Sequence, residues 1–254
     1  MRSKAVVGNW KLNGSLAANE ALLKALLREI PRENPVACAV CVPSPYLAQA
    51  RALLEGSGIG WGSQDVSRFD KGAYTGDVSG AMVAEFGARY AIVGHSERRT
   101  IFAETDEVVA DKYAAARRAK LTPIFCVGET LAEREAGRTE AVLARQVDAL
   151  LAKCGAKELD GGIVAYEPVW AIGTGKTATS QQAQEAHAFI RGRIGAKDGN
   201  VAGKLPILYG GSVKAANAAE LFAMPDVDGG LVGGASLVAE EFVAIWRAAG
   251  ARAK

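Results

Sequence analysis

Eight short runs of hydrophobic residues recur along the chain, each followed by a polar or glycine-rich turn. Most of these runs are continuously apolar instead of alternating, which is typical of parallel strands that are covered on both faces. The pattern predicts strands that begin near Ala5, Val36, Ile59, Tyr90, Thr122, Gly162, Pro206 and Gly229.

The segments between these runs carry apolar residues at the spacing of amphipathic helices. Pro31 is expected to end the first of these helices, because proline cannot continue a helix. The clearest apolar stripes are Leu22, Leu23, Leu26, Leu27 and Ile30; then Leu143, Val147, Leu150 and Leu151; and finally Val238, Phe242 and Ile245.

Repeated strand and helix units, without an antiparallel hairpin signal, favour a closed (β/α)8 barrel, the TIM-barrel architecture, over an open doubly wound sheet. No Gly-x-Gly-x-x-Gly sequence opens a helix, which also argues against a dinucleotide-binding sheet. Such a barrel commonly uses about 250 residues as one domain, so we expect residues 1–254 to form a single α/β domain.

Composition narrows the class of protein. Hydrophobic residues make up 49% and charged residues 23% of the chain, as in ordinary globular proteins. The net charge of +2 is not gathered in a basic run, so nucleic acid is not an expected partner. The apolar stretch Ala5–Val7 is too short for a signal peptide, and nothing approaches the roughly 18 apolar residues of a membrane span. We therefore expect a soluble cytoplasmic protein with no membrane partner.

The cysteines do not suggest a metal or redox centre. Cys38 and Cys41 form a Cys-x-x-Cys sequence inside a predicted strand, where their odd spacing directs the two side chains to opposite faces. No second pair completes a zinc site. We interpret both cysteines as small buried hydrophobic residues and predict no metal.

The barrel interpretation requires catalytic groups to lie where strands end, and chemically capable residues are found there. Glu167 ends the sixth apolar run and enters a loop that continues to Ala178. A carboxylate at a strand end is held firmly, while the glycines after it allow the loop to change conformation. Glu167 is therefore the candidate base and the loop a candidate lid. Its Gly175-Lys176-Thr177 resembles the end of a nucleotide-binding P-loop, but Trp170 stands where that motif requires glycine.

His95 follows the fourth run, beside Ser96 and Glu97. A serine hydrolase is disfavoured, because Arg98 stands where a Gly-x-Ser-x-Gly elbow needs glycine. At the start of a helical turn, free N–H groups disfavour a protonated imidazole, so a neutral His95 is expected to donate a hydrogen bond to a carbonyl. His187 lies within a helical stretch and is assigned no role.

The remaining strand ends offer groups for an anionic substrate. Asn9 and Lys11 can together stabilise a developing oxyanion. Gly210-Gly211-Ser212 and Gly233-Gly234 follow the last two strands, where barrels bind phosphate through loop amides, and Gly173 is available from the lid.

With these residues identified, the chain resembles the triosephosphate isomerase family through motifs that occur in family order and span nearly its whole length. Leu12 stands where the family usually has methionine, and Gly230 where it often has an aromatic residue. The motifs are NWKLNG at 9–14, GAYTGDVSGAM at 72–82, GHSERR at 94–99, AYEPVWAIGTGKTA at 165–178, YGGSV at 209–213 and LVGGASL at 231–237.

The resemblance implies interconversion of dihydroxyacetone phosphate and glyceraldehyde 3-phosphate without a cofactor. Glu167 would remove the proton from the carbon next to the carbonyl, while His95 and Asn9 would polarise the carbonyl oxygens. Lys11 would stabilise the negative charge near the phosphate and the enediolate, and Glu97 would support Lys11 and His95.

The resemblance further implies the phosphate site, the lid and a homodimer. The loop from Asp65 to Val78 would enter a partner subunit, with Thr75 as its contact. The phosphate-binding residues would be Gly173, Ser212, Gly233 and Gly234, and the lid would comprise Pro168, Val169, Trp170, Gly173, Gly175, Lys176 and Ala178.

Two alternatives remain at this point. Another phosphosugar isomerase or epimerase could share the phosphate site but use a different acid and base. A barrel that only binds a phosphometabolite could retain the glycines without the chemistry, although Lys11, His95 and Glu167 together argue against it.

Overall fold

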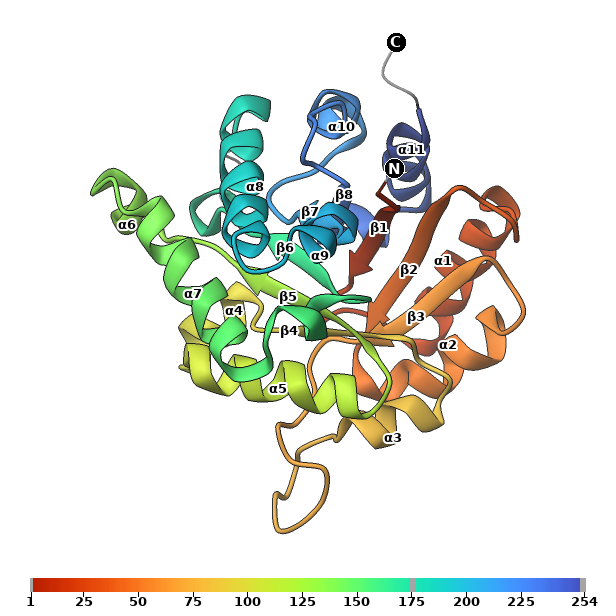
Figure 1. Cartoon of the computed structure of the whole chain (residues 1–254). Helices are drawn as coiled ribbons and strands as arrows, with labels where there is room; N and C mark the ends of the chain where they lie inside the picture. The colour runs from red at the N-terminus through yellow and green to blue at the C-terminus, as the bar shows by residue number, and fades with distance from the viewer. Residues whose placement is uncertain (1, 174–176, 252–254) are drawn as a thin grey trace.

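The computed structural model describes residues 2–173 and 177–251, and its centre is a closed barrel of parallel strands (Figure 1). Neighbouring strands pair in chain order, and β8 pairs with β1 to close the barrel. The predicted barrel is confirmed, with strand starts within one residue of those expected. The strands are β1 (Lys4–Asn9), β2 (Val36–Val42), β3 (Ile59–Ser63), β4 (Tyr90–Val93), β5 (Thr122–Val127), β6 (Ile163–Tyr166), β7 (Ile207–Tyr209) and β8 (Gly229–Val232).

Helices surround the strands (Figure 1). The α-helices are α1 (Leu16–Glu29), α2 (Leu47–Leu54), α3 (Gly80–Glu85), α4 (Ser96–Ile101), α5 (Asp106–Arg118), α6 (Leu131–Glu135), α7 (Thr139–Cys154), α8 (Ser180–Gly195), α9 (Gly199–Lys204), α10 (Ala215–Phe222) and α11 (Ala239–Gly250). Short 3-10 turns are η1 (Ser44–Tyr46), η2 (Ala156–Leu159), η3 (Val169–Ala171) and η4 (Gly234–Leu237). None of the helices in the described ranges combines the length and apolar character needed to cross a membrane.

The predicted apolar stripes form the buried faces of these helices, with one exception. Leu23 and Leu26 of α1 are buried, and the helix ends before Pro31 as expected. In α11, Phe242 and Ile245 are fully buried. Val238 is instead extended, precedes the helix and is 48% exposed, so its assignment to the buried stripe was wrong. The helical spacing extends the predicted helix one residue before the actual start of α11 at Ala239.

The core has two layers, one inside the barrel and one between the strands and the helices. Cys41 belongs to the inner layer and Cys38 to the outer layer, which confirms that they point to opposite faces of β2. Burial raises the pKa of the Cys38 thiol to about 12 and also raises that of Cys41. Both therefore pack as neutral hydrophobic groups, as predicted.

The loop between β3 and α3 projects from the body of the molecule, at the bottom of the view in Figure 1. Its base is closed by Ser67, whose N–H donates to the carbonyl of Val78 at 2.8 Å. The rings of Phe69 and Tyr74 stack with centroids 3.8 Å apart. Thr75 is exposed. The loop therefore has internal order and presents its outer residues away from its own barrel.

Candidate active site

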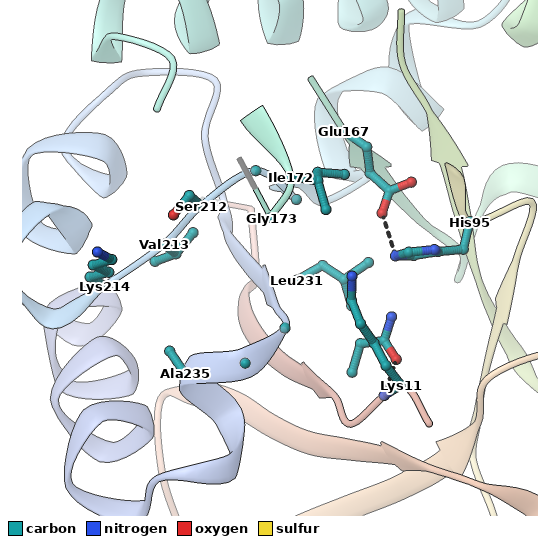
Figure 2. Close-up of a pocket in the computed structure, with 15 residues that line it drawn as sticks. Lys11, His95, Glu167, Ile172, Gly173, Ser212, Val213, Lys214, Leu231 and Ala235 are labelled. Carbon is teal, nitrogen blue, oxygen red and sulfur yellow. Dashed lines mark hydrogen bonds and ion pairs between the residues drawn. The ribbon is translucent and has the colours of Figure 1, made fainter. Parts of the chain in front are cut away.

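A cavity of about 310 Å³ lies at the carboxyl ends of the strands (Figure 2). All of the predicted catalytic and substrate-binding residues line it, except Glu97. The predicted residues that it brings together are Asn9, Lys11, His95, Glu167, Gly173, Ser212, Gly233 and Gly234.

Glu167 is held by the strand end that precedes it and by the neighbouring β5 segment. Its N–H donates to the carbonyl of Val127 at 2.7 Å. A Cβ atom on Gly128 would lie only 1.7 Å from the carbonyl oxygen of Glu167, so the two backbones can approach this closely only because residue 128 is glycine. The side chain of Glu167 is 2% exposed, and both carboxylate oxygens have partners. Oε2 accepts from the Ser96 N–H at 2.8 Å, and Oε1 lies 2.9 Å from Nε2 of His95.

These contacts determine the charge of Glu167. Burial by itself raises the pKa of this carboxyl group, but the His95 contact, the Ser96 N–H and the positive charge of Lys11 outweigh burial and lower it. Glu167 is therefore ionised at neutral pH, as a base must be.

His95 caps the amino end of α4, where its Nδ1 accepts a hydrogen bond from the Glu97 N–H at 3.2 Å. A neutral ring in this position carries its proton on Nε2, the atom that faces Glu167 (Figure 2). Burial lowers the pKa of His95, but the carboxylates of Glu167 and Glu97 raise it further, so it lies above the usual value. This direction is opposite to the one predicted from the helix start alone, because that prediction did not include the contact with Glu167.

Lys11 and Asn9 form one unit at the end of β1. Oδ1 of Asn9 accepts from the Lys11 N–H at 3.0 Å, which leaves the Asn9 amide group as a donor. Lys11 adopts the left-handed conformation, with φ of 52°, which is uncommon for a residue with a side chain. Gln64 holds it there by donating to the Lys11 carbonyl at 2.8 Å and to the Cys41 carbonyl at 3.1 Å.

Glu97 lies beside the cavity and is 43% exposed. Its Oε1 is 2.5 Å from Nζ of Lys11, and its Oε2 is 3.6 Å from Nδ1 of His95. Glu97 thus contacts both residues that the family resemblance assigned to it, from outside the cavity wall.

The structure adds residues that the motifs did not single out. Lys214, two residues after the Gly-Gly-Ser sequence that follows β7, lines the cavity across from His95 in Figure 2. Its position in the sequence, next to the predicted phosphate-binding turn, could have identified it as a candidate site residue. Leu231 reaches the cavity from β8 and belongs to the inner barrel layer. The other additional lining residues are Ile172, Val213 and Ala235, and the cavity also includes Gly210 and Gly211 of the predicted phosphate-binding turn.

The predicted lid is anchored at both ends. At its start, Nε1 of Trp170 donates to Glu129 at 2.9 Å, and the Arg134 guanidinium lies 4.6 Å from the Trp170 ring centroid. At its end, the N–H of Ala178 donates to the hydroxyl of Tyr209 at 3.3 Å.

Pro168 and Val169 lie between β6 and the anchored tryptophan, and Gly173 has φ of 70°. Gly175 and Lys176 lie outside the described residues. Among the side chains that the structure describes, no three His, Cys, Asp or Glu residues are grouped to hold a metal ion.

Comparison with known proteins agrees with this geometry. Residues 4–249 match the family model described as triosephosphate isomerase. A protein of that name from Thiobacillus denitrificans is 61% identical over 249 residues, covering 98% of this chain and 99% of the relative. Those from Ralstonia nicotianae and Nitrosomonas eutropha are 60% and 56% identical, covering 97% and 98% of this chain and 99% and 98% of the relatives. The closed barrel, the residues gathered at its carboxyl end and these matches agree, and the chain belongs to the triosephosphate isomerase family.

Proposed function

We propose that this protein interconverts dihydroxyacetone phosphate and D-glyceraldehyde 3-phosphate through an enediolate, by proton transfer and without a cofactor. The observation that carries the proposal is the buried pair of Glu167 and His95, 2.9 Å apart, in a cavity that also contains Asn9 and Lys11. Membership of the family supports the choice of substrate.

Glu167 removes the substrate proton from the carbon next to the carbonyl. The carboxylate of Glu167 contacts His95, so a bound substrate must place its carbonyl oxygen at Nε2 of His95 and release Glu167 toward the adjacent carbon. This exchange removes the His95 contact, the largest of the influences that lower the pKa of Glu167, while burial continues to raise it. Substrate binding therefore makes Glu167 a stronger base at the moment when it is needed.

The negative charge that develops on the substrate oxygens needs donors at fixed positions. Nε2–H of His95 and the amide group of Asn9 supply hydrogen bonds, and the ammonium group of Lys11 supplies positive charge. Because these groups are already held by Glu97, the Lys11 backbone and Gln64, little reorganisation accompanies the reaction.

The phosphate group fits the opposite side of the cavity. Gly173, Ser212, Gly233 and Gly234 line that side and offer backbone N–H groups, and Lys214 adds positive charge. Closure of Pro168 to Ala178 over the substrate would exclude water, which strengthens the electrostatic contacts and protects the enediolate from losing its phosphate.

The proposal includes a homodimer. Large apolar side chains remain exposed beside the catalytic segments: Leu12 next to Lys11 is 97% exposed, and Ile101 and Phe102 at the end of α4 are 71% and 62% exposed. Tyr74 on the projecting loop and Met82 on α3 are 42% and 51% exposed. Exposed apolar groups of this size are typical of a protein interface. We propose that the 65–78 loop, through Thr75, enters a second copy, and that each chain is one cytoplasmic domain.

A coupled isomerase assay on the purified protein tests the activity, with dihydroxyacetone phosphate and glyceraldehyde 3-phosphate compared with pentose and hexose phosphates. Turnover confined to the triose phosphates, with solvent deuterium incorporated at the carbon next to the carbonyl, is expected. Preference for another sugar phosphate would support a related isomerase or epimerase, and binding without turnover would support a phosphometabolite-binding barrel. A fully active monomer in sedimentation would contradict the dimer.

A further inference from the structure

A second cavity, of about 490 Å³, lies at the end of the barrel opposite the active site. It is bounded by the amino-terminal ends of three adjacent strands, including Cys38 of β2, Ile59 of β3 and Tyr90 of β4. Its volume is within the range of small-molecule sites, roughly 300 to 1,000 Å³. A ligand here would not compete with a substrate at the carboxyl end of the strands.

The distinctive feature of this cavity is a pair of unpaired arginines, Arg32 and Arg89. Within residues 2–173 and 177–251 every arginine forms an ion pair with a carboxylate except Arg28, Arg32, Arg89 and Arg138. Two of these four therefore line one cavity. Because this chain otherwise matches its arginines to carboxylates, two unmatched guanidinium groups at one concave site point to an anion from outside the chain.

The other charged group in the cavity wall does not neutralise this pair. Glu55 lines the cavity but lies 3.7 Å from Arg51, with which it forms an ion pair one helical turn away. The cavity surface thus retains the positive charge of Arg32 and Arg89.

The remaining wall suits the carbon framework of an organic ligand. Trp61 directs its N–H to the carbonyl of Phe86 at 2.9 Å, which leaves an apolar ring surface at the cavity. The phenol of Tyr90 is half-buried, and burial raises its pKa, so its hydroxyl is a neutral donor. Burial likewise keeps the Cys38 thiol neutral, with a pKa of about 12. The site therefore combines two arginines with aromatic and neutral groups.

We propose that this cavity binds an organic polyanion, a small molecule with two or more carboxylate or phosphate groups, between Arg32 and Arg89. Each guanidinium can bind one anionic group in a bidentate manner, and the aromatic wall contacts the carbon framework between the anionic groups. The site is separate from the proposed catalytic residues, so it does not depend on the isomerase activity.

Isothermal titration calorimetry of the full chain, with the active site saturated by a phosphate-bearing substrate analogue, tests the proposal. Citrate, 1,6-hexanediol bisphosphate and inorganic phosphate are the three probes. The first two distinguish a carboxylate from a phosphate ligand, and the third measures binding of a simple anion. The test variant is R32Q/R89Q. Its control is R28Q/R138Q, which removes the same charge from the other two unpaired arginines.

Saturable binding of citrate or of the bisphosphate at one site per chain is expected, weakened at least about tenfold in R32Q/R89Q and unchanged within about twofold in R28Q/R138Q. Normal isomerase turnover in both variants shows that they are folded. The proposal is overturned if no probe binds, if inorganic phosphate binds as tightly as the organic probes, or if both double variants weaken binding equally.

Discussion

Nε2 of His95 lies 2.9 Å from Oε1 of Glu167, although the two residues follow different strands, β4 and β6, and are far apart in sequence. Each group is thus the contact partner of the atom that the other would use on the substrate. Nε2 of His95 faces a carboxylate instead of a substrate carbonyl, and the other carboxylate oxygen of Glu167 accepts a hydrogen bond from the Ser96 N–H. The two groups are therefore paired with each other, and the proposed mechanism requires the substrate to replace each of them as the other's partner.

Replacing Glu167 with Gln keeps the shape of the side chain and its contact with His95 but removes the base. We expect kcat to fall by about 10²- to 10⁴-fold or more, while binding of a phosphate-bearing analogue remains largely intact. Steady-state kinetics and calorimetry measure the two quantities. Glu140→Gln, an exposed carboxylate on α7, is the matched control and should behave like the unmodified protein. Near-normal turnover of the Glu167 variant would remove it as the base.

Replacing His95 with Gln removes the imidazole donor, whose orientation is fixed by the Glu97 N–H, and leaves a flexible amide in its place. Loss of one donor in comparable sites slows the reaction by about 10²- to 10³-fold. The exchange of the substrate C–H proton with solvent, followed by nuclear magnetic resonance, should slow by this factor. If exchange continues at the original rate, the group that polarises the carbonyl must lie elsewhere.

The parts of the site that could be predicted from sequence are those fixed by local pattern. Continuous apolar runs located each strand, and the strand ends located Lys11, His95 and Glu167. Val238 was assigned wrongly because helical spacing does not by itself show where a helix begins.

The parts that could not be predicted depend on distances across the barrel. The pKa of His95 is raised by Glu167, a contact between two strand ends that neither local sequence reveals. Lys214, just before α10, and Leu231, on β8, line the cavity, and no motif specified the directions of their side chains. The sequence also does not show that Arg32 and Arg89 lack an ion-pair partner and line the same cavity, because both facts depend on the three-dimensional positions of other side chains.

Gly128 is expected to tolerate no side chain, because its backbone is fixed on both sides. Gln146 accepts from its N–H at 2.8 Å and donates to its carbonyl at 3.1 Å, while the Glu167 carbonyl occupies the place of a Cβ. Gly128→Ala should therefore displace Glu167, and a shift of about 1 Å in a reacting group can cost about 10²-fold in rate.

The expected signature of Gly128→Ala is a large fall in kcat with a smaller change in KM, since three of the four proposed phosphate-binding residues, Ser212, Gly233 and Gly234, follow other strands than Glu167. Gly192→Ala is the control, because residue 192 is helical and a Cβ there meets no atom within 4 Å. The control should retain its activity and its stability, or gain slightly in stability. Equal kinetics in the two variants would show that Gly128 does not position the base.

His187 gives the fold a pH dependence of its own. It is fully buried on α8 between Tyr166 and Tyr209, with ring centroids 5.8 Å and 6.4 Å away, and its Nδ1 lies 3.1 Å from the carbonyl of Asp226. Burial lowers its pKa from 6.5 to about 4, because a charged imidazole loses its hydration there.

Below pH 6.5 the unfolded chain takes up a proton at residue 187, whereas the folded chain does so only near pH 4. The free energy of unfolding must therefore fall as the pH is lowered through this window, by up to about 3 kcal/mol from this residue, and the contribution disappears above pH 6.5. Urea unfolding at fixed protein concentration from pH 4 to 8 measures the slope. His187→Gln cannot titrate, so its stability should decline less between pH 6.5 and 4 than that of the unmodified protein, even if it is lower at pH 8. Parallel curves for the two proteins would mean that other groups set the acid sensitivity and that His187 is equally easy to protonate in both states.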